Sequence, residues 1–247
     1  MSGLLVAARY LTILPLPASD HGSLDNLGRA AAWFPVVGFG IGAGLVLVDR
    51  VTTWLFPSLL SALLVVTAWK LLTGGLHLDG LADCLDGLVG RDPAQRLAIM
   101  RDSRIGAFGA VGLILFLFLE VAAVSEIGTP WRWGALLTAP AFARATPPLT
   151  ARLFRTARPY GHGAAFRAGL SRAAAPVALA VASLVALLGL GPGGLVATAV
   201  ALAAAVLVAW FLAARLGGIT GDVLGASIEA AELVTLLAVS AWTHPRL

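Results

Sequence analysis

The sequence predicts an all-α, polytopic integral membrane protein with about seven transmembrane helices. Hydrophobic residues make up 59% of the 247 residues and charged residues 12%, about half the charged fraction of a typical globular domain. The mean hydropathy is +0.90, and several apolar stretches are long enough to cross a hydrocarbon core of about 30 Å. We expect seven spans, at residues 33–48, 57–72, 105–124, 133–153, 173–190, 194–216 and 223–242.

Three of these spans and the amino-terminal stretch need separate justification. The first two spans are short, and the fourth is interrupted by Pro140, Pro147 and Pro148. Residues 4–16 are too few to cross a bilayer and carry Arg9 in their middle, so we expect them to lie in the interface. No basic region precedes them, so a cleaved signal peptide is not expected. Because no long polar linker divides the chain, residues 1–247 are expected to form one domain.

The basic residues predict the orientation of the spans. With the amino terminus inside, seven spans place twelve arginines on one side, namely Arg9, Arg29, Arg91, Arg96, Arg101, Arg104, Arg152, Arg155, Arg158, Arg167, Arg172 and Arg215. Only Arg50, Arg132 and Arg246 fall on the other side. Cytoplasmic loops carry such an excess, so we expect an active site at the cytoplasmic face of the membrane. The arginines lie in short loops without a nucleic-acid motif, so no nucleic-acid partner is expected.

Three aspartates share one face of a predicted cytoplasmic helix. Asp79, Asp83 and Asp86 have i, i+4 and i+7 spacing, which places them within roughly 60° on a helix. Like charges stacked in this way repel unless a cation lies between them, and a hard divalent ion such as Mg²⁺ takes oxygen ligands. The sequence therefore predicts a metal site here, although a solvated helix face has the same pattern. Cys84, the only cysteine, excludes an internal disulfide and is expected to be a small buried residue of this helix.

The segment that follows is expected to bind an anion. Residues 91–93 form a turn and a new helix start, and Asp102 or Ser103 is the expected N-cap of the third span. The amino end of that span, beside Arg101 and Arg104, would suit phosphoryl oxygens, although interface anchoring explains each arginine equally well. The expected proton acceptor is Asp86 or Asp102, and His77 is a further catalytic candidate, either orienting a carboxylate or accepting a proton.

A second acidic cluster opens the last span. Asp222, Glu229 and Glu232 lie within roughly 80° on a helix, and intramembrane carboxylates are costly enough to suggest function. Glu229 and Glu232 could bind a second ion or neutralise Lys70 and Arg144, and Asp222 is a candidate metal ligand. Glu120 is expected to snorkel at the outer end of its span. The candidate substrate ligands are Arg101, Ser103, Arg104, Lys70, Arg144, Thr220 and Glu229.

Two further features concern the same face. The spacing Gly-Gly-x-x-x-Asp occurs at residues 74–79 and again at 217–222, each time after a span that exits to the cytoplasm. As a repeat, it would bring two acidic helix starts to one membrane edge. His162 lies in an arginine-flanked loop long enough to cover a substrate.

The chain resembles the cobalamin synthase family (adenosylcobinamide-GDP ribazoletransferase). The resemblance is carried by residues 73–86 and 99–109, with further matches at 12–17, 35–38 and 217–232. One departure is Cys84-Leu85, where the family has Thr-Ala or Thr-Cys; the aspartates are intact.

This resemblance implies the last assembly step of the vitamin B12 coenzyme. The enzyme would use Mg²⁺ to join adenosylcobinamide-GDP to α-ribazole or its 5′-phosphate, releasing GMP. The resemblance leaves open whether the chain forms a homo-oligomer or associates with other cobalamin-assembly enzymes.

Two other functions remain as alternatives. A CDP-alcohol phosphotransferase of lipid metabolism also clusters aspartates around Asp-Gly, but its pattern needs Ala-Arg three residues later, where this chain has Ala82-Asp83. A cation-coupled transporter could use Lys70, Arg144, Glu229 and Glu232 as a pathway, although the polar groups gather at one face only.

Overall fold

The computed structural model, which describes residues 3–17 and 25–244, is a helical bundle with α13 (Gly221–Thr243) at its centre. The long helices around it are α3 (Phe34–Leu55), α4 (Ser58–Leu72), α7 (Ala107–Glu126), α8 (Trp131–Ala143), α11 (Ala174–Leu190) and α12 (Pro192–Leu216). Each of the seven predicted spans is therefore helical. The described part of the chain contains no β-strand, only an isolated bridge between Thr156 and Ile219.

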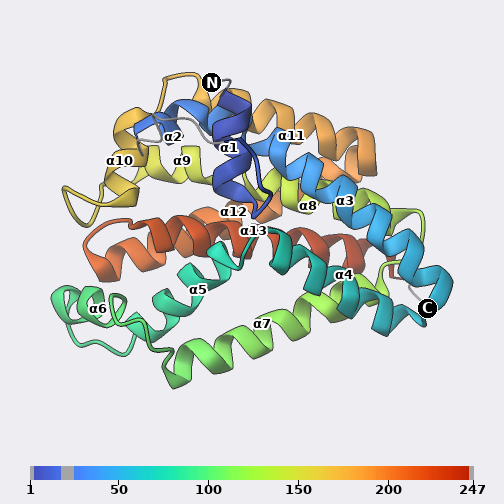
Figure 1. Ribbon diagram of the computed structural model, residues 1–247, viewed down its shortest axis with the longest axis horizontal. Coiled ribbons are helices and arrows are strands. Elements are labelled where there is room, and N and C mark those ends of the chain that lie inside the picture. Colours follow the sequence, from blue (N-terminus) through green and yellow to red (C-terminus); the bar gives the residue numbers. More distant parts are fainter. Residues whose placement is uncertain (1–2, 18–24, 245–247) are drawn as a thin grey trace.

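The shorter helices gather mainly at one end of this bundle (Figure 1). They are α1 (Gly3–Leu11), α2 (Asp25–Ala30), the 3₁₀ turn η1 (Ala31–Trp33), α5 (Leu76–Gly87), α6 (Pro93–Ile99), α9 (Thr146–Leu153) and α10 (His162–Gly169). The chain reaches α13 from this end and finishes at the opposite end (Figure 1). This arrangement gathers at one end of the bundle the connecting segments that carry most of the predicted site residues.

The number of membrane spans is four to six by length and composition. Four helical segments pass alone, at 27–55, 107–126, 192–216 and 221–243, and two bent pairs, α4 with α5 and α10 with α11, would bring the number to six. The predicted fourth span is divided into α8 and α9 after Ala143, in the region of the three prolines. The chain is a multi-pass membrane protein, and the count of seven stays a prediction.

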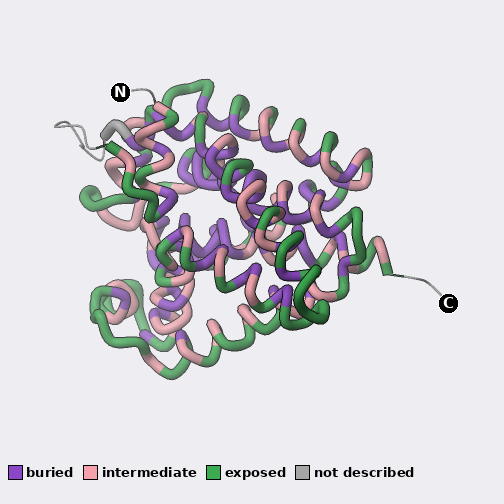
Figure 2. The backbone as a smooth tube through the Cα atoms, turned by 45° about the vertical axis from the view of Figure 1, so that its right-hand side comes forward, coloured by how far each residue is buried: buried purple, intermediate pink, exposed green. Residues whose placement is uncertain are grey.

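Outward-facing apolar side chains identify the lipid-facing surface. Phe118 on α7 and Leu188 on α11 are 74% and 78% exposed, which a water-soluble domain would avoid over so many neighbouring positions. Buried residues concentrate instead in the middle of the bundle (Figure 2). Small residues allow close helix packing there, as Ala178, Ala182, Ala201 and Ala205 of α11 and α12 are fully buried.

Local sequence signals explain several helix ends. The Asp92 side chain accepts a hydrogen bond from the Gln95 amide at 2.9 Å and Pro93 opens α6, as predicted. Gly74 and Gly75 follow α4 with φ of 63° and 66°, a conformation that favours glycine. The turn at these glycines redirects the chain by 90° into α5.

The two ends of the bundle should lie on opposite sides of the membrane. In a Cys84→Ala background, cysteines at Asp92 and Arg172 at one end should react together with an impermeant thiol reagent applied to one face. Cysteines at Thr53 and Gly128, exposed near the other end, should react only from the opposite face. Mass spectrometry of vesicles labelled from each side measures this, and labelling of Asp92 and Gly128 from the same face would contradict the arrangement.

Candidate active site

A cavity of about 330 Å³ opens between the starts of α5 and α13. His77 and Asp79 of α5 line it together with Thr220 and Asp222, which precede and open α13. Its other walls come from α1, the start of α3, and the loop leading into α10. Four of the predicted site residues therefore meet in one cavity, from segments about 140 positions apart in sequence.

Two glycines bring α5 and α13 close enough to place these groups together. A Cβ atom on Gly80 would lie 2.9 Å from the Asp222 Cα, so no larger side chain fits without moving one helix. On the facing helix, a Cβ atom on Gly225 would lie 3.3 Å from the His77 Cα. Asp79 and Asp222 are therefore held near the point where the two helices are in closest contact.

The repeated Gly-Gly-x-x-x-Asp spacing forms the same local structure at both places. Gly217 and Gly218, like Gly74 and Gly75, have positive φ, at 79° and 152°, and end one helix before the next begins. Asp79 and Asp222 each fall in the first turn of the following helix. The expectation that the repeat brings two acidic helix starts together is confirmed by their shared cavity.

Asp83 lies one turn farther along α5, where Asp86 in turn contacts the first residues of α7. Unlike Asp79 and Asp222, Asp83 does not line the cavity. Partial burial, followed by the negative charges of Asp79, Asp222 and Asp86, raises the pKa of Asp83 to about 6. Across the described residues, Asp79, Asp83 and Asp222 form no ion pair with a basic side chain. Thr220 donates a hydrogen bond to Asp222, and Arg158 acts on it as a more distant positive charge. The protein therefore compensates the charge of this acidic cluster only partly.

Asp86 caps α7. Its carboxylate oxygens accept hydrogen bonds from the amides of Gly106 at 2.7 Å and Gly109 at 2.8 Å. The expectation that Asp102 or Ser103 caps this helix is wrong, because α7 begins after Gly106 and a carboxylate from α5 occupies its first turn. The same contact uses the amides that were expected to bind an anion.

The arginine segment between α6 and α7 lies outside the cavity. Arg101, Asp102, Ser103 and Arg104 are all exposed. The Arg104 guanidinium donates to Asp102 at 2.6 Å and holds the pKa of that carboxyl at about 2. Asp102 is therefore the partner of Arg104. Of this group, Arg101 comes nearest the cavity, since its Nη2 atom lies 3.5 Å from the hydroxyl of Tyr160, a lining residue.

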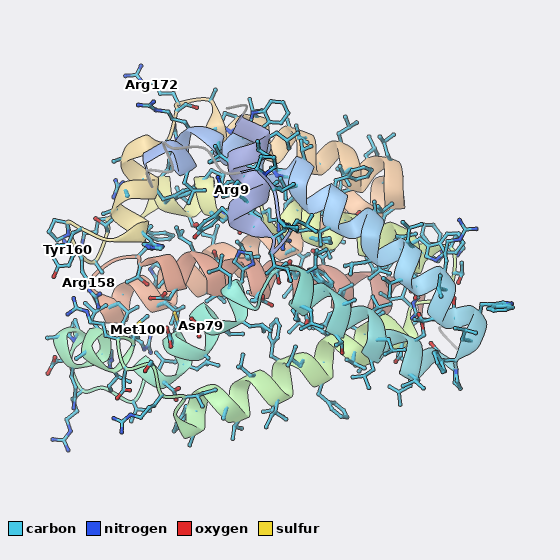
Figure 3. All side chains as sticks on the ribbon, viewed as in Figure 1. Arg9, Asp79, Met100, Arg158, Tyr160 and Arg172 are labelled. Atoms are coloured by element: carbon cyan, nitrogen blue, oxygen red, sulfur yellow. The ribbon has the colours of Figure 1, made fainter. Side chains whose placement is uncertain are left out.

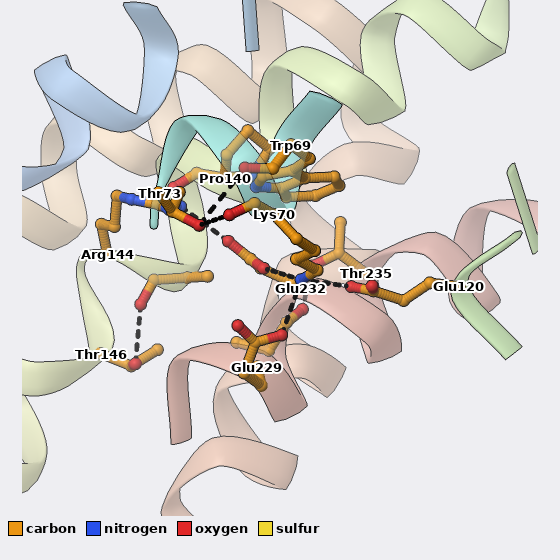
Figure 4. Close-up of polar contacts among 12 residues, drawn as sticks. Trp69, Lys70, Thr73, Glu120, Pro140, Arg144, Thr146, Glu229, Glu232 and Thr235 are labelled. Atoms are coloured by element: carbon orange, nitrogen blue, oxygen red, sulfur yellow. Dashed lines mark hydrogen bonds and ion pairs between the residues drawn. The ribbon is translucent and has the colours of Figure 1, made fainter. Parts of the chain in front are cut away.

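Lys70 is the centre of a buried charge network (Figure 4). Its ammonium donates to Glu120 of α7 at 3.0 Å, and to Glu229 and Glu232 of α13 at 2.7 and 3.0 Å. Arg144 donates to the other oxygen of Glu232 at 2.7 Å. Two roles were considered for Glu229 and Glu232, metal binding and neutralisation of Lys70 and Arg144. The structure shows the second.

In this network Glu120 lies elsewhere than the sequence predicts, and the carboxylates that converge there already have a cation. Glu120 was expected to snorkel, but it is fully buried because Lys70 reaches it from α4. Glu120, Glu229 and Glu232 are the one group of three described carboxylates whose ligand atoms lie within 4.8 Å of one another. The Lys70 ammonium already supplies their cation. Lys70, Arg144 and Glu229 do not line the cavity.

Sequence reasoning missed most of the remaining cavity wall. Arg158 and Tyr160 line it from the loop before α10 and His162 from the first residue of that helix, and of these only His162 was considered. Tyr10, Phe34 and Phe166 complete it from three different helices. Figure 3 shows Asp79, Arg158 and Tyr160 at the same end of the molecule. Aromatic residues inside apolar segments carry no sequence signal that separates a cavity wall from ordinary core.

Comparisons with known proteins agree over nearly the whole chain. The sequence model of the cobalamin-5-phosphate synthase family matches residues 3–240. A protein of Bradyrhizobium diazoefficiens is 40% identical, with 100% of this chain and 96% of the relative covered. A protein of Geotalea daltonii is 38% identical, with 96% of each covered, and one of Pseudomonas paraeruginosa is 40% identical, with 97% and 98% covered. All three are named adenosylcobinamide-GDP ribazoletransferase, and no solved structure matches.

Asp86→Ala should loosen the start of α7. Loss of a capping carboxylate typically costs about 0.5–2 kcal/mol, so the amides of residues 106–110 should exchange faster with deuterium. Asp92→Ala, which removes the cap of α6 at the same end of the molecule, is the matched control and should leave α7 unchanged. Unchanged exchange at residues 106–110 in Asp86→Ala would contradict the capping role.

Proposed function

This chain belongs to the cobalamin-5-phosphate synthase family, and we propose that the cavity between α5 and α13 is its active site. It is a transferase of cobalamin biosynthesis that joins adenosylcobinamide-GDP to α-ribazole and releases GMP. The observation that carries the site assignment is the meeting of Asp79 and Asp222, from two helix starts far apart in sequence, in one cavity.

We assign Mg²⁺ as the cofactor of this site from the chemistry of its carboxylates. Asp79, Asp83 and Asp222 offer hard oxygen ligands. Partial burial, followed by the charges of the neighbouring carboxylates, raises the pKa of Asp83, and a bound divalent cation would oppose that shift. These three residues would hold the ion, while Asp86 is assigned to capping α7. When bound, Mg²⁺ would neutralise charge on the diphosphate and on the departing GMP.

The reaction requires an in-line exchange at one phosphorus atom. The hydroxyl oxygen of α-ribazole forms a bond to the phosphorus that carries the cobinamide, the bond from that phosphorus to the GMP oxygen breaks, and the hydroxyl proton leaves. Positioning and charge stabilisation dominate such reactions. Arg158 lines the cavity and supplies positive charge for phosphoryl oxygens.

The hydroxyl proton is assigned to a histidine of the cavity. Imidazole is the side chain best suited to accept a proton at neutral pH, and both His77 and His162 line the cavity. Burial, followed by the positive charge of Arg144, lowers the pKa of His77 to about 3, so we assign the role to His162. Asp86 and Asp102, the acceptors expected from sequence, do not line it, and each already has hydrogen-bond donors of its own.

We place the site at the cytoplasmic face of the inner membrane. The arginines assigned to the cytoplasmic side lie in the last turns of helices or in the segments between them, toward the end of the bundle that holds α6 and α10 (Figure 1). Of the three expected on the other side, Arg50 and Arg132 lie near its other end, and Arg246 lies outside the described residues. Positive residues favour the cytoplasm, where nucleotide substrates are available.

The family assignment does not favour the two alternatives. In addition, the charges proposed for a transport pathway are already paired, as Lys70 contacts three glutamates and Arg144 contacts Glu232.

Asp83→Asn should reduce GMP release from adenosylcobinamide-GDP and α-ribazole at least a hundredfold in detergent-purified protein. The substitution removes one ligand charge without changing volume, so the thermal unfolding midpoint should stay near that of the wild type. Asp92→Asn makes the same chemical change at the exposed cap of α6, where Asn also caps, and should keep activity within about twofold. Near-normal turnover of Asp83→Asn at limiting Mg²⁺ would contradict the assignment.

The Mg²⁺ requirement should increase in acid. Because the pKa of Asp83 is raised to about 6, protons compete with the metal at that carboxylate below about pH 6. The Mg²⁺ concentration for half-maximal GMP release should then rise up to about tenfold for each pH unit below 6 and be nearly flat above pH 7. A half-saturating concentration that does not change between pH 5 and 7.5 would contradict metal binding at Asp83.

A further inference from the structure

The lining of the active-site cavity is of two chemical kinds. One part, called here the Asp79–Asp222 end, consists of the carboxylates of Asp79 and Asp222 and the hydroxyl of Thr220, which donates to Asp222 at 3.1 Å. The other part, called here the aromatic end, consists of three stacked aromatic rings. The Tyr10 and Phe34 ring centroids are 6.3 Å apart with planes at 17°, and those of Phe34 and Phe166 are 5.8 Å apart with planes at 25°.

The size of the cavity limits what it can enclose. A volume of about 330 Å³ is near the lower end of the range for small-molecule sites. It suits one nucleoside, whereas a corrinoid carrying GDP is several times larger. Of the two substrates of the proposed reaction, only α-ribazole can be held inside as a whole.

The aromatic end suits the base of α-ribazole better than guanine. Around the rings lie apolar side chains, including those of Leu11, Ile219 and Ile228. Guanine presents donors and an acceptor along one edge, and an apolar wall would leave them without hydrogen bonds, at considerable cost. Dimethylbenzimidazole has a flat apolar face and two methyl groups, which stacking and apolar contact bind well.

We propose that this cavity is the α-ribazole site, with the base against Tyr10, Phe34 and Phe166 and the ribose hydroxyl directed to the Asp79–Asp222 end. This inference rests on the proposed function. Phe34 and Phe166 are almost fully buried and come from α3 and α10. Because the packing of these helices forms the base site, the site is already present in the folded protein and can bind α-ribazole before the second substrate arrives.

Residues 155–157, which lead into the cavity wall formed by Arg158 and Tyr160, are hydrogen-bonded to the segment just before α13. Thr156 pairs with Ile219, with the Ala157 amide donating to the Ile219 carbonyl and the Ile219 amide to the Arg155 carbonyl, both at 2.9 Å. A Cβ atom on Gly218 would lie 2.5 Å from the Ala157 nitrogen, so this close approach requires glycine. Arg158 and Tyr160 follow at once in the chain. The diphosphate of the larger substrate is then left to approach from the mouth, where Asp79 and Tyr160 are exposed.

The test compares the two substrates in variants of the aromatic end. In Phe166→Ala, the KM for α-ribazole should rise about tenfold or more, since stacking on one base typically contributes about 1–3 kcal/mol, while the KM for adenosylcobinamide-GDP stays within about twofold. Phe39→Ala, on the exposed face of α3, is the matched control and should change neither KM. Phe166→Leu and Tyr10→Leu keep most of the packing volume and should show the same asymmetry if Phe166→Ala does not fold.

Binding without turnover separates this inference from the proposed function. Wild-type protein should bind α-ribazole alone in calorimetry, bind the riboside of unmethylated benzimidazole more weakly, and lose part of that preference in Phe166→Leu. A rise in the KM for adenosylcobinamide-GDP instead, or no change in either KM, would overturn the α-ribazole assignment while GMP release by the wild type still supports the reaction. Absence of GMP release by the wild type would overturn the proposed function itself.

Discussion

The contact of the Lys70 ammonium with three glutamates is the interaction on which the rest of the structure depends. Lys70 is the only lysine of the chain, and it joins α4 to Glu120 on α7 and to Glu229 and Glu232 on α13. Arg144 adds α8 through the second oxygen of Glu232. Removing one partner from such a buried set typically costs about 3–5 kcal/mol, because a charge is left unpaired. The four helices are therefore held at a fixed height relative to one another along the bundle axis.

This relative height of the helices also fixes the position of the proposed active site. Asp79 follows Lys70 by nine residues across the turn at Gly74 and Gly75, and Asp222 precedes Glu229 by two helical turns. Once Lys70 and Glu229 are paired, both helix starts are fixed, and the close contact at Gly80 and Gly225 determines their separation. Stable pairing in the membrane interior thus supports a cluster of like charges at its edge, where partial burial and then repulsion between carboxylates raise the pKa of Asp83. A divalent cation can bind to this excess negative charge and can in turn bind a phosphorylated substrate.

How much could be predicted from sequence depended on whether the signal was local. Hydropathy located every long helix, because lipid requires about 20 consecutive apolar residues whatever the tertiary fold. The Gly-Gly-x-x-x-Asp repeat located Asp79 and Asp222 correctly because glycine conformation is a local property. The cap that Asp86 forms on α7, the burial of Glu120 beside Lys70 and the stacking of Tyr10 on Phe34 all depend on partners far away in sequence. Nothing near those residues reveals them.

The most direct measurement is iron-mediated cleavage at the metal site. Fe²⁺ replaces Mg²⁺ in oxygen-ligand sites, and with ascorbate and peroxide it cuts the backbone close to where it is bound. The account predicts two cleavage sites, one in α5 near Asp79 and Asp83 and one at the start of α13 near Asp222, both suppressed by excess Mg²⁺. Cleavage confined to the arginine segment at residues 101–106, or in α13 near Glu229 and Glu232, would show that the metal binds elsewhere and would contradict the account.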